Sequence, residues 1–159
     1  MKLPSRRWAV AATVGTLAAV AAIDPTVSPP VAKGDAFITA QTTGVLTIEG
    51  GECFSDPAYS PEAGEVVVRY EPCESGADNQ SYGFLRAADG PWDRARLAGF
   101  GWQGCRTYFE RRWPDGADGT LDFYPVLPTE QTWADGDRTV MCAVYRPRGR
   151  LTDSVLPLR

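Results

Sequence analysis

Four cysteines constrain the fold of this chain more than any other feature: Cys53, Cys73, Cys105 and Cys142. In an exported chain of this size they predict two disulfides, with three possible connectivities that spacing alone does not decide. Order along the chain favours Cys53–Cys73 and Cys105–Cys142. The alternative is a zinc site, but the short CxxC-type knuckles it needs are missing, and thiolates outside the cytoplasm oxidise readily. We therefore expect a domain held by two disulfides, with no free thiol.

The N-terminus has the layout of an export signal. The cations Lys2, Arg6 and Arg7 precede an uncharged, Ala-rich run of sixteen residues at 8–23. This run is shorter than the roughly 20 residues of a membrane-spanning helix. Residues 1–23 are thus predicted to be a signal peptide or an N-terminal membrane anchor. The protein would be extracytoplasmic, either secreted or attached to the cell membrane by this segment.

The remaining chain divides into a linker and one domain. Residues 24–42 contain Pro25, Pro29 and Pro30 and show no usable hydrophobic period, which predicts an extended Pro-rich linker. Residues 43–159 are then one domain, long enough to bury a real core.

Composition narrows the possible functions. The formal net charge is -4, and without Lys2, Arg6 and Arg7 it is -7, which disfavours nucleic acid as a partner. The chain has no His, and this absence removes Ser-His and Cys-His nucleophile systems, His-ligated zinc and imidazole acid/base chemistry. No cofactor is predicted, and contact with the membrane is expected only through the N-terminal segment.

Hydrophobic patterning predicts an α+β fold, in which a small antiparallel sheet packs against one main helix. Expected strands lie at residues 44–49, 65–70, 81–87, 121–126 and 138–145, with a further edge at 154–158. A loop is expected at 55–64. Residues 92–112 read as the helix, with an apolar side that includes Cys105. Its interior glycines each cost about 1 kcal/mol, so a break is expected near residues 99–101.

One stretch, residues 123–142, has the clearest local signals. Thr129, after Pro128, is a helix N-cap, and a short helical turn should carry Trp133 inward. Gly136 lies in the turn of Asp135-Gly136-Asp137, with Arg138 opening the next strand. We expect these residues to be structural.

These residues carry a resemblance to a known family. The motif Phe123-Tyr124-Pro125, with Pro128-Thr129, Trp133, Gly136-Asp137-Arg138 and Cys142 in order, resembles the septum formation domain of envelope proteins from high-GC Gram-positive bacteria. Gly51-Glu52-Cys53-Phe54, residues 68–73 and Cys105 extend the resemblance over about residues 44–146. It implies an exported or membrane-tethered domain linked to cell division, with no assigned catalytic residues.

The chain departs from that family at one point. The family usually continues from its second cysteine into a Pro-His pair and an acidic residue, whereas Cys73 is followed here by residues 74–80, ESGADNQ. Any function of that histidine in the family is absent from this chain.

Candidate sites have plainer structural interpretations. Asp115, Asp118 and Asp122 resemble a calcium loop, but their spacing departs from EF-hand order, and Asp-Gly pairs form turns without metal. No catalytic, cofactor-binding or metal-ligating residue is therefore assigned. A hydrolase could draw its carboxylates from Glu52, Asp78, Glu110 and Asp137, although no spacing selects a pair.

Aromatic and basic residues offer two further surfaces. A glycan or peptide groove is one interpretation of the larger aromatic side chains, and core packing is the favoured one. The residues concerned are Tyr82, Phe84, Trp92, Trp102, Tyr108, Phe109 and Trp133. The basic C-terminus reads as a solvated tail.

The expected function is a non-catalytic, exported or membrane-tethered envelope domain. It would bind a protein partner or a cell-wall component as an accessory of septum formation. The alternatives are an extracytoplasmic, carboxylate-dependent hydrolase and a calcium-dependent adhesion or sensing module.

Overall fold

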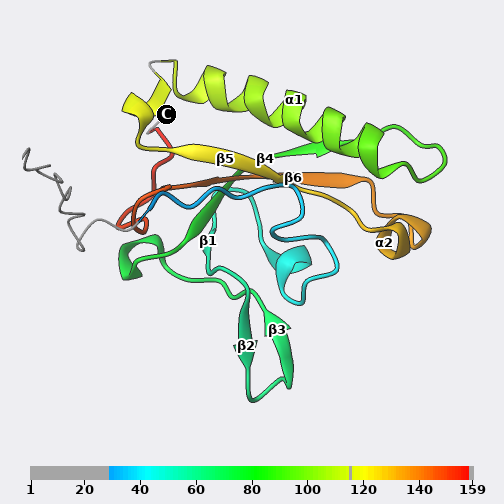
Figure 1. The fold of residues 1–159 in the computed structure, drawn as a ribbon, viewed down its shortest axis with the longest axis horizontal. Helices are drawn as coiled ribbons and strands as arrows, with labels where there is room; N and C mark the ends of the chain where they lie inside the picture. The colour runs from blue at the N-terminus through cyan, green and yellow to red at the C-terminus, as the bar shows by residue number, and fades with distance from the viewer. Residues whose placement is uncertain (1–28, 115, 158–159) are drawn as a thin grey trace, which may run out of the picture.

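The computed structural model describes residues 29–114 and 116–157. It has the expected α+β fold, with a four-stranded antiparallel sheet in the order β1-β4-β6-β5 and one main helix, α1. The bounds are β1 Cys53–Phe54, β4 Asn79–Arg86, β5 Asp122–Val126, β6 Thr139–Tyr145 and α1 Arg94–Arg112. Figure 1 shows α1 lying along one face of the sheet, with the earlier part of the chain on the other face.

Strand β6 is the centre of this arrangement, because it pairs with both β4 and β5 and is buried on both faces. Its side chains point alternately into two core clusters, one on each face of the sheet. Val140, Cys142 and Val144 pack under α1, while Met141 and Tyr145 belong to the core on the opposite face. A β-bulge between Ser81 and Gly83 shifts the register of β4 against β6.

Helix α1 begins at an Asp93 N-cap, whose carboxylate accepts a hydrogen bond from the Arg96 N–H at 3.0 Å. The predicted break at 99–101 is wrong: the helix runs unbroken to Arg112. Packing explains this, because the helix lies close to the sheet where a larger side chain would not fit. A Cβ on Gly101 would lie 3.0 Å from both Leu127 and Pro125.

Part of the predicted linker belongs to the folded domain. From Val31 onward the chain runs against the sheet, with Ile38 1% exposed and packed in the core opposite α1. The Val31 N–H donates to Pro147 O at 2.8 Å, and the Ala40 N–H to Leu127 O at 2.9 Å. This segment has no helical or strand period, and burial of its apolar side chains stabilises its position against the sheet.

Three predicted strands differ in the structure. Residues 44–49 form a 3-10 turn, η1 Val45–Thr47, because Gly44 has a left-handed φ of 93°. The strand predicted at 65–70 is shorter, β3 Glu65–Val67, and pairs with β2 Ala58–Ser60 inside the predicted loop. Residues 154–157 form no strand, and Leu158 lies outside the described residues. The other short helices are η2 Cys73–Ser75, η3 Gly116–Gly119 and α2 Glu130–Ala134.

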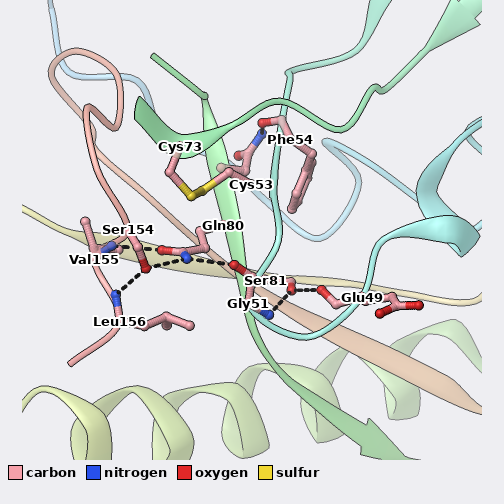
Figure 2. The surroundings of a disulfide bond; sticks show 11 residues. Glu49, Gly51, Cys53, Phe54, Cys73, Gln80, Ser81, Ser154, Val155 and Leu156 are labelled. Carbon is pink, nitrogen blue, oxygen red and sulfur yellow. Dashed lines mark hydrogen bonds between the residues drawn. A yellow bond between two sulfur atoms is a disulfide. The ribbon is translucent and has the colours of Figure 1, made fainter. Parts of the chain in front are cut away.

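Both predicted disulfides are present, Cys53–Cys73 and Cys105–Cys142. The first joins β1 to η2, and the second joins α1 to β6. Near the first, the buried Gln80 side chain donates to Gly51 O and Ser154 Oγ, both at 2.8 Å, and accepts from the Val155 N–H at 2.9 Å (Figure 2). These bonds hold the C-terminal segment against the sheet.

Candidate functional site

The motif at residues 128–138 forms a framework around α2. Thr129 makes a capping box with Thr132. Trp133 is 5% exposed and donates its indole N–H to Gly90 O at 3.0 Å. Arg138 donates to Trp133 O at 2.7 Å and to Asp89 Oδ1 at 2.8 Å. Pro128 is buried just before α2, and Gly136 follows the helix in a left-handed conformation with φ 97°.

Asp137 of this motif is different, because one of its carboxylate oxygens has no partner. Its N–H donates to Thr132 O at 2.8 Å, and Oδ1 accepts from the Thr139 N–H at 2.8 Å. Oδ2 is the single buried side-chain polar atom in residues 29–114 and 116–157 without a hydrogen-bond partner. A buried unpaired oxygen costs free energy, so Asp137 keeps an acceptor that the described residues leave unsatisfied.

A hollow of about 140 Å³ lies beside Asp137 on the sheet face opposite α1. We call it the Asp137 hollow. It is mostly apolar, and its lining residues are Ala40, Val45, Leu46, Ile48, Phe84, Val126, Asp137, Thr139 and Met141. Leu46 and Phe84 are 68% and 39% exposed. The hollow therefore combines an apolar wall with one unsatisfied acceptor.

The Asp137 hollow is next to an open strand edge. Strand β4 contributes Phe84 to the lining and pairs with β6 along its inner edge. On its outer edge, β1 reaches only Asn79 and Gln80, and no described strand pairs with residues 82–86. An unpaired edge of this kind is a template for an extended segment of another chain.

The carboxylates of the hydrolase hypothesis have separate surroundings. Glu52 accepts from the Glu49 N–H at 2.8 Å. Asp78 accepts from the Asp56 N–H and from Arg150, both at 2.9 Å. Glu110 is exposed on α1. Of these candidates, Asp137 alone lines the Asp137 hollow.

The predicted calcium loop falls partly outside the described residues, since Asp115 does. Asp118 is exposed in η3, and Asp122 opens β5. Asp122 Oδ1 accepts from the Phe123 N–H at 2.8 Å, and Oδ2 accepts from the Tyr145 hydroxyl at 3.1 Å. Within residues 29–114 and 116–157, no three Asp, Glu or Cys side chains are grouped to hold a metal ion.

The aromatic candidates do not form one groove. Tyr82, Phe109 and Trp133 are buried, and Phe84 is the exposed member at the Asp137 hollow. Trp92, Trp102 and Tyr108 are half-buried. Core packing therefore accounts for most of them.

No family model, curated protein or solved structure matches this chain. The two disulfides are consistent with an extracytoplasmic or otherwise oxidising location. None of the helices in the described part of the chain has the length and apolar composition needed to cross a membrane. The predicted signal or anchor at residues 1–23 lies outside the described residues.

The main feature that sequence reasoning missed is a buried lysine, Lys33, inside the predicted linker. A signal for it was present. Lys33 is the only lysine apart from Lys2, whereas the chain has fourteen arginines among its 16 basic residues. A single lysine in a chain that otherwise uses arginine marks a position where the two side chains are not equivalent.

Proposed function

We propose that this protein is a non-catalytic, extracytoplasmic domain of the cell envelope that binds a partner protein at the Asp137 hollow. The observation that carries the proposal is Asp137 itself, which lines a mostly apolar depression and has one unpartnered carboxylate oxygen. A partner side chain with an apolar stem and a charged N–H donor would satisfy both features, as lysine and arginine do.

The surroundings of the hollow support an extended partner segment. A strand added along residues 82–86 of β4 would satisfy the outer edge of the sheet with main-chain hydrogen bonds. The same segment would shield the exposed apolar side chains of Leu46 and Phe84 from water. The negative net charge of -4 also favours a basic segment.

A role in septum formation is part of the proposal, and it rests on the resemblance of the motif at residues 123–142. The two disulfides are consistent with the envelope location. The alternative hydrolase would need a second carboxylate converging on Asp137, and the lining of the hollow includes one carboxylate.

Site-specific photo-crosslinking in growing cells tests the binding site. A photoreactive amino acid at position 46 should give a protein adduct, because this position borders the hollow. The same residue at position 59 is the matched control, since Tyr59 is 66% exposed on β2, away from the hollow.

The charge of Asp137 is tested in the same experiment. Asp137→Asn keeps an acceptor for the Thr139 N–H and removes the negative charge, so the adduct from position 46 should weaken at least tenfold. Equal adducts from positions 46 and 59, or an adduct from position 46 unaffected by Asp137→Asn in folded protein, would contradict the proposal.

A further inference from the structure

Lys33 is buried at the centre of a polar cluster that joins three parts of the chain. Its side chain is 4% exposed, and its Nζ contacts Asp56 Oδ1 and Asn79 Oδ1, the latter at 2.9 Å. Phe37, Tyr124 and Tyr145 surround the amine, with ring centroids 5.0, 6.0 and 4.9 Å from Nζ. We call Lys33, Asp56, Asn79 and Tyr124 the Lys33 cluster.

The carboxamide of Asn79 is held in one orientation. Its Oδ1 accepts from Lys33 Nζ and from the Tyr124 hydroxyl, both at 2.9 Å. Its Nδ2 donates to Asp56 Oδ1 at 2.9 Å and to Phe54 O at 3.4 Å. The Tyr124 hydroxyl polarises this carbonyl, as a donor of an oxyanion hole does, and the bond to Oδ1 keeps Nζ close to the carboxamide carbon.

Asp56 connects the amine to the amide nitrogen. The same oxygen, Oδ1, accepts from Lys33 Nζ and from Asn79 Nδ2. A carboxylate in this position can take a proton from one nitrogen and deliver it to the other. Its side chain is 37% exposed, which leaves the cluster open to solvent on this side for a small leaving group.

Burial gives the two flanking groups suitable protonation states. Desolvation lowers the pKa of Lys33 despite the opposing hydrogen bond and charge of Asp56, and this makes the neutral, nucleophilic amine more accessible. Desolvation also raises the pKa of Tyr124 well above 10, so its hydroxyl stays protonated as a donor. Arginine at position 33 would supply a cation but no nucleophile, because the guanidinium stays protonated.

We propose that Lys33 and Asn79 join in an intramolecular isopeptide bond, formed by the protein itself. The neutral Lys33 Nζ attacks Asn79 Cγ, and the C=O electron pair moves to Oδ1, where the Tyr124 hydroxyl stabilises it. Asp56 takes one proton from Nζ and passes it to Nδ2. The Cγ–Nδ2 bond then breaks, ammonia leaves, and a secondary amide remains. The step needs no oxidant, reductant or further reactant.

This bond would be a third covalent link in the domain, independent of the proposed binding function. The two disulfides close separations of 20 and 37 residues, and the isopeptide bond would close one of 46. It would fasten the N-terminal segment to β4, so a pull on the N-terminus would reach the sheet through a covalent bond.

Intact-mass and peptide analysis of the exported, full-length protein tests the proposal. Formation of the bond should lower the mass by about 17 Da relative to the disulfide-bonded chain. Trypsin should fail to cut after Lys33. The peptide that ends at Arg69 should stay joined to residues 70–86 after reduction of the disulfides, because the amide survives reduction.

Two variants identify the atoms. Lys33→Arg removes the nucleophile, and Asp56→Asn keeps the size of the side chain but removes the proton acceptor. Both should have the unlinked mass while retaining both disulfides. If either variant fails to fold, the mass and peptide linkage of the wild-type protein still decide the question.

The outcomes that would overturn the proposal are distinct. One is a wild-type mass equal to that of the disulfide-bonded chain, with the peptides separating on reduction. Another is a loss of about 18 Da with Lys33 linked to Asp56, which would be condensation with a carboxylate. A third is a loss of about 17 Da that persists in Lys33→Arg, which would indicate a succinimide at Asn79 instead.

Discussion

The Arg138 guanidinium lies 3.9 Å from the centroid of the Trp133 ring and donates a hydrogen bond to the Trp133 carbonyl at 2.7 Å. The two residues therefore hold each other by a cation–π contact and a charge-assisted bond, with the same guanidinium bonded to Asp89. Trp133 in turn packs against Trp92 at 6.1 Å between ring centroids. Both rings belong to a core cluster with Ala87 and Leu97.

Trp133→Ala should lower the free energy of unfolding by about 3 to 5 kcal/mol, as large aromatic deletions in cores do. The expected loss follows from the 5% exposure of Trp133 and from its indole bond to Gly90 O. Denaturant unfolding of the oxidised protein measures it, with Trp133→Phe as a milder control. A variant that matched the parent in stability but lost partner binding would make Trp133 a binding residue instead.

The two disulfides should contribute unequally. In the loop-entropy model, the 37-residue separation of Cys105–Cys142 is worth about 4 kcal/mol and the 20-residue separation of Cys53–Cys73 about 3 kcal/mol. Paired Cys→Ala variants, compared by denaturant unfolding, measure this order. Alkylation of native exported protein should find no free thiol, and four alkylated cysteines would show that the disulfides do not form.

Two glycines of α1 should respond oppositely to alanine. At Gly99 a Cβ meets nothing within 4 Å, so Gly99→Ala should stabilise the protein by up to about 1 kcal/mol through helix propensity. At Gly101 it would meet Leu127, Pro125 and Val140 at 3.0 to 3.2 Å, so Gly101→Ala should destabilise by about 1 to 3 kcal/mol. Thermal unfolding of the two variants checks this contrast. Equal effects would mean that α1 does not approach the sheet at Gly101.

Stability should fall in alkaline solution. Burial raises the pKa of Tyr82 and of Tyr124 above 10, so the folded state keeps protons that the unfolded chain loses near pH 10. Above that pH each tyrosine should lower the free energy of unfolding by about 1.4 kcal/mol per pH unit. A free Lys33 amine would have the opposite effect on stability, because its lowered pKa makes the folded state lose this proton first. That effect ends near pH 10.4, where the amine of the unfolded chain also becomes neutral.

Unfolding measured between pH 8 and pH 11 tests this dependence. Tyr82→Phe should make the free energy of unfolding fall less steeply with pH. The variant also loses the hydrogen bond to Cys105 O, so the slope against pH is the readout and the absolute stability is not. Tyr59→Phe makes the same substitution at an exposed position and is the matched control. An identical slope in Tyr82→Phe would show that Tyr82 titrates normally.

Calcium should not raise the melting temperature at millimolar concentration. Both carboxylate oxygens of Asp122 already accept hydrogen bonds, from the Phe123 N–H and the Tyr145 hydroxyl. A weak extracellular site near 10⁻³ M would begin to respond in this range. A rise of several degrees that Asp118→Ala abolishes and magnesium does not reproduce would establish a calcium site.

Local signals in the sequence determined the elements whose stabilising groups lie a few residues apart. The Thr129 cap bonds to Thr132, and Gly136 supplies a left-handed turn, so both could be predicted from neighbouring residues. The β-rich run at 138–145 was sufficient to predict β6, and the candidate strand at 81–87 corresponds to β4. The cysteine count indicated two disulfides, and their order along the chain favoured the pairing found.

Tertiary structure decided the features that depend on residues far apart in the chain. Helix α1 continues through its glycines because the sheet lies against Gly101, a contact that helix propensity does not include. Residues 31–42 fold onto the sheet because Ile38 is buried in a core formed by later strands. Lys33 meets Asn79 across 46 positions, and Asp137 Oδ2 loses its water only once the strands around it are assembled. Packing, burial and desolvation act between surfaces that exist only in the folded chain, so no local pattern encodes them.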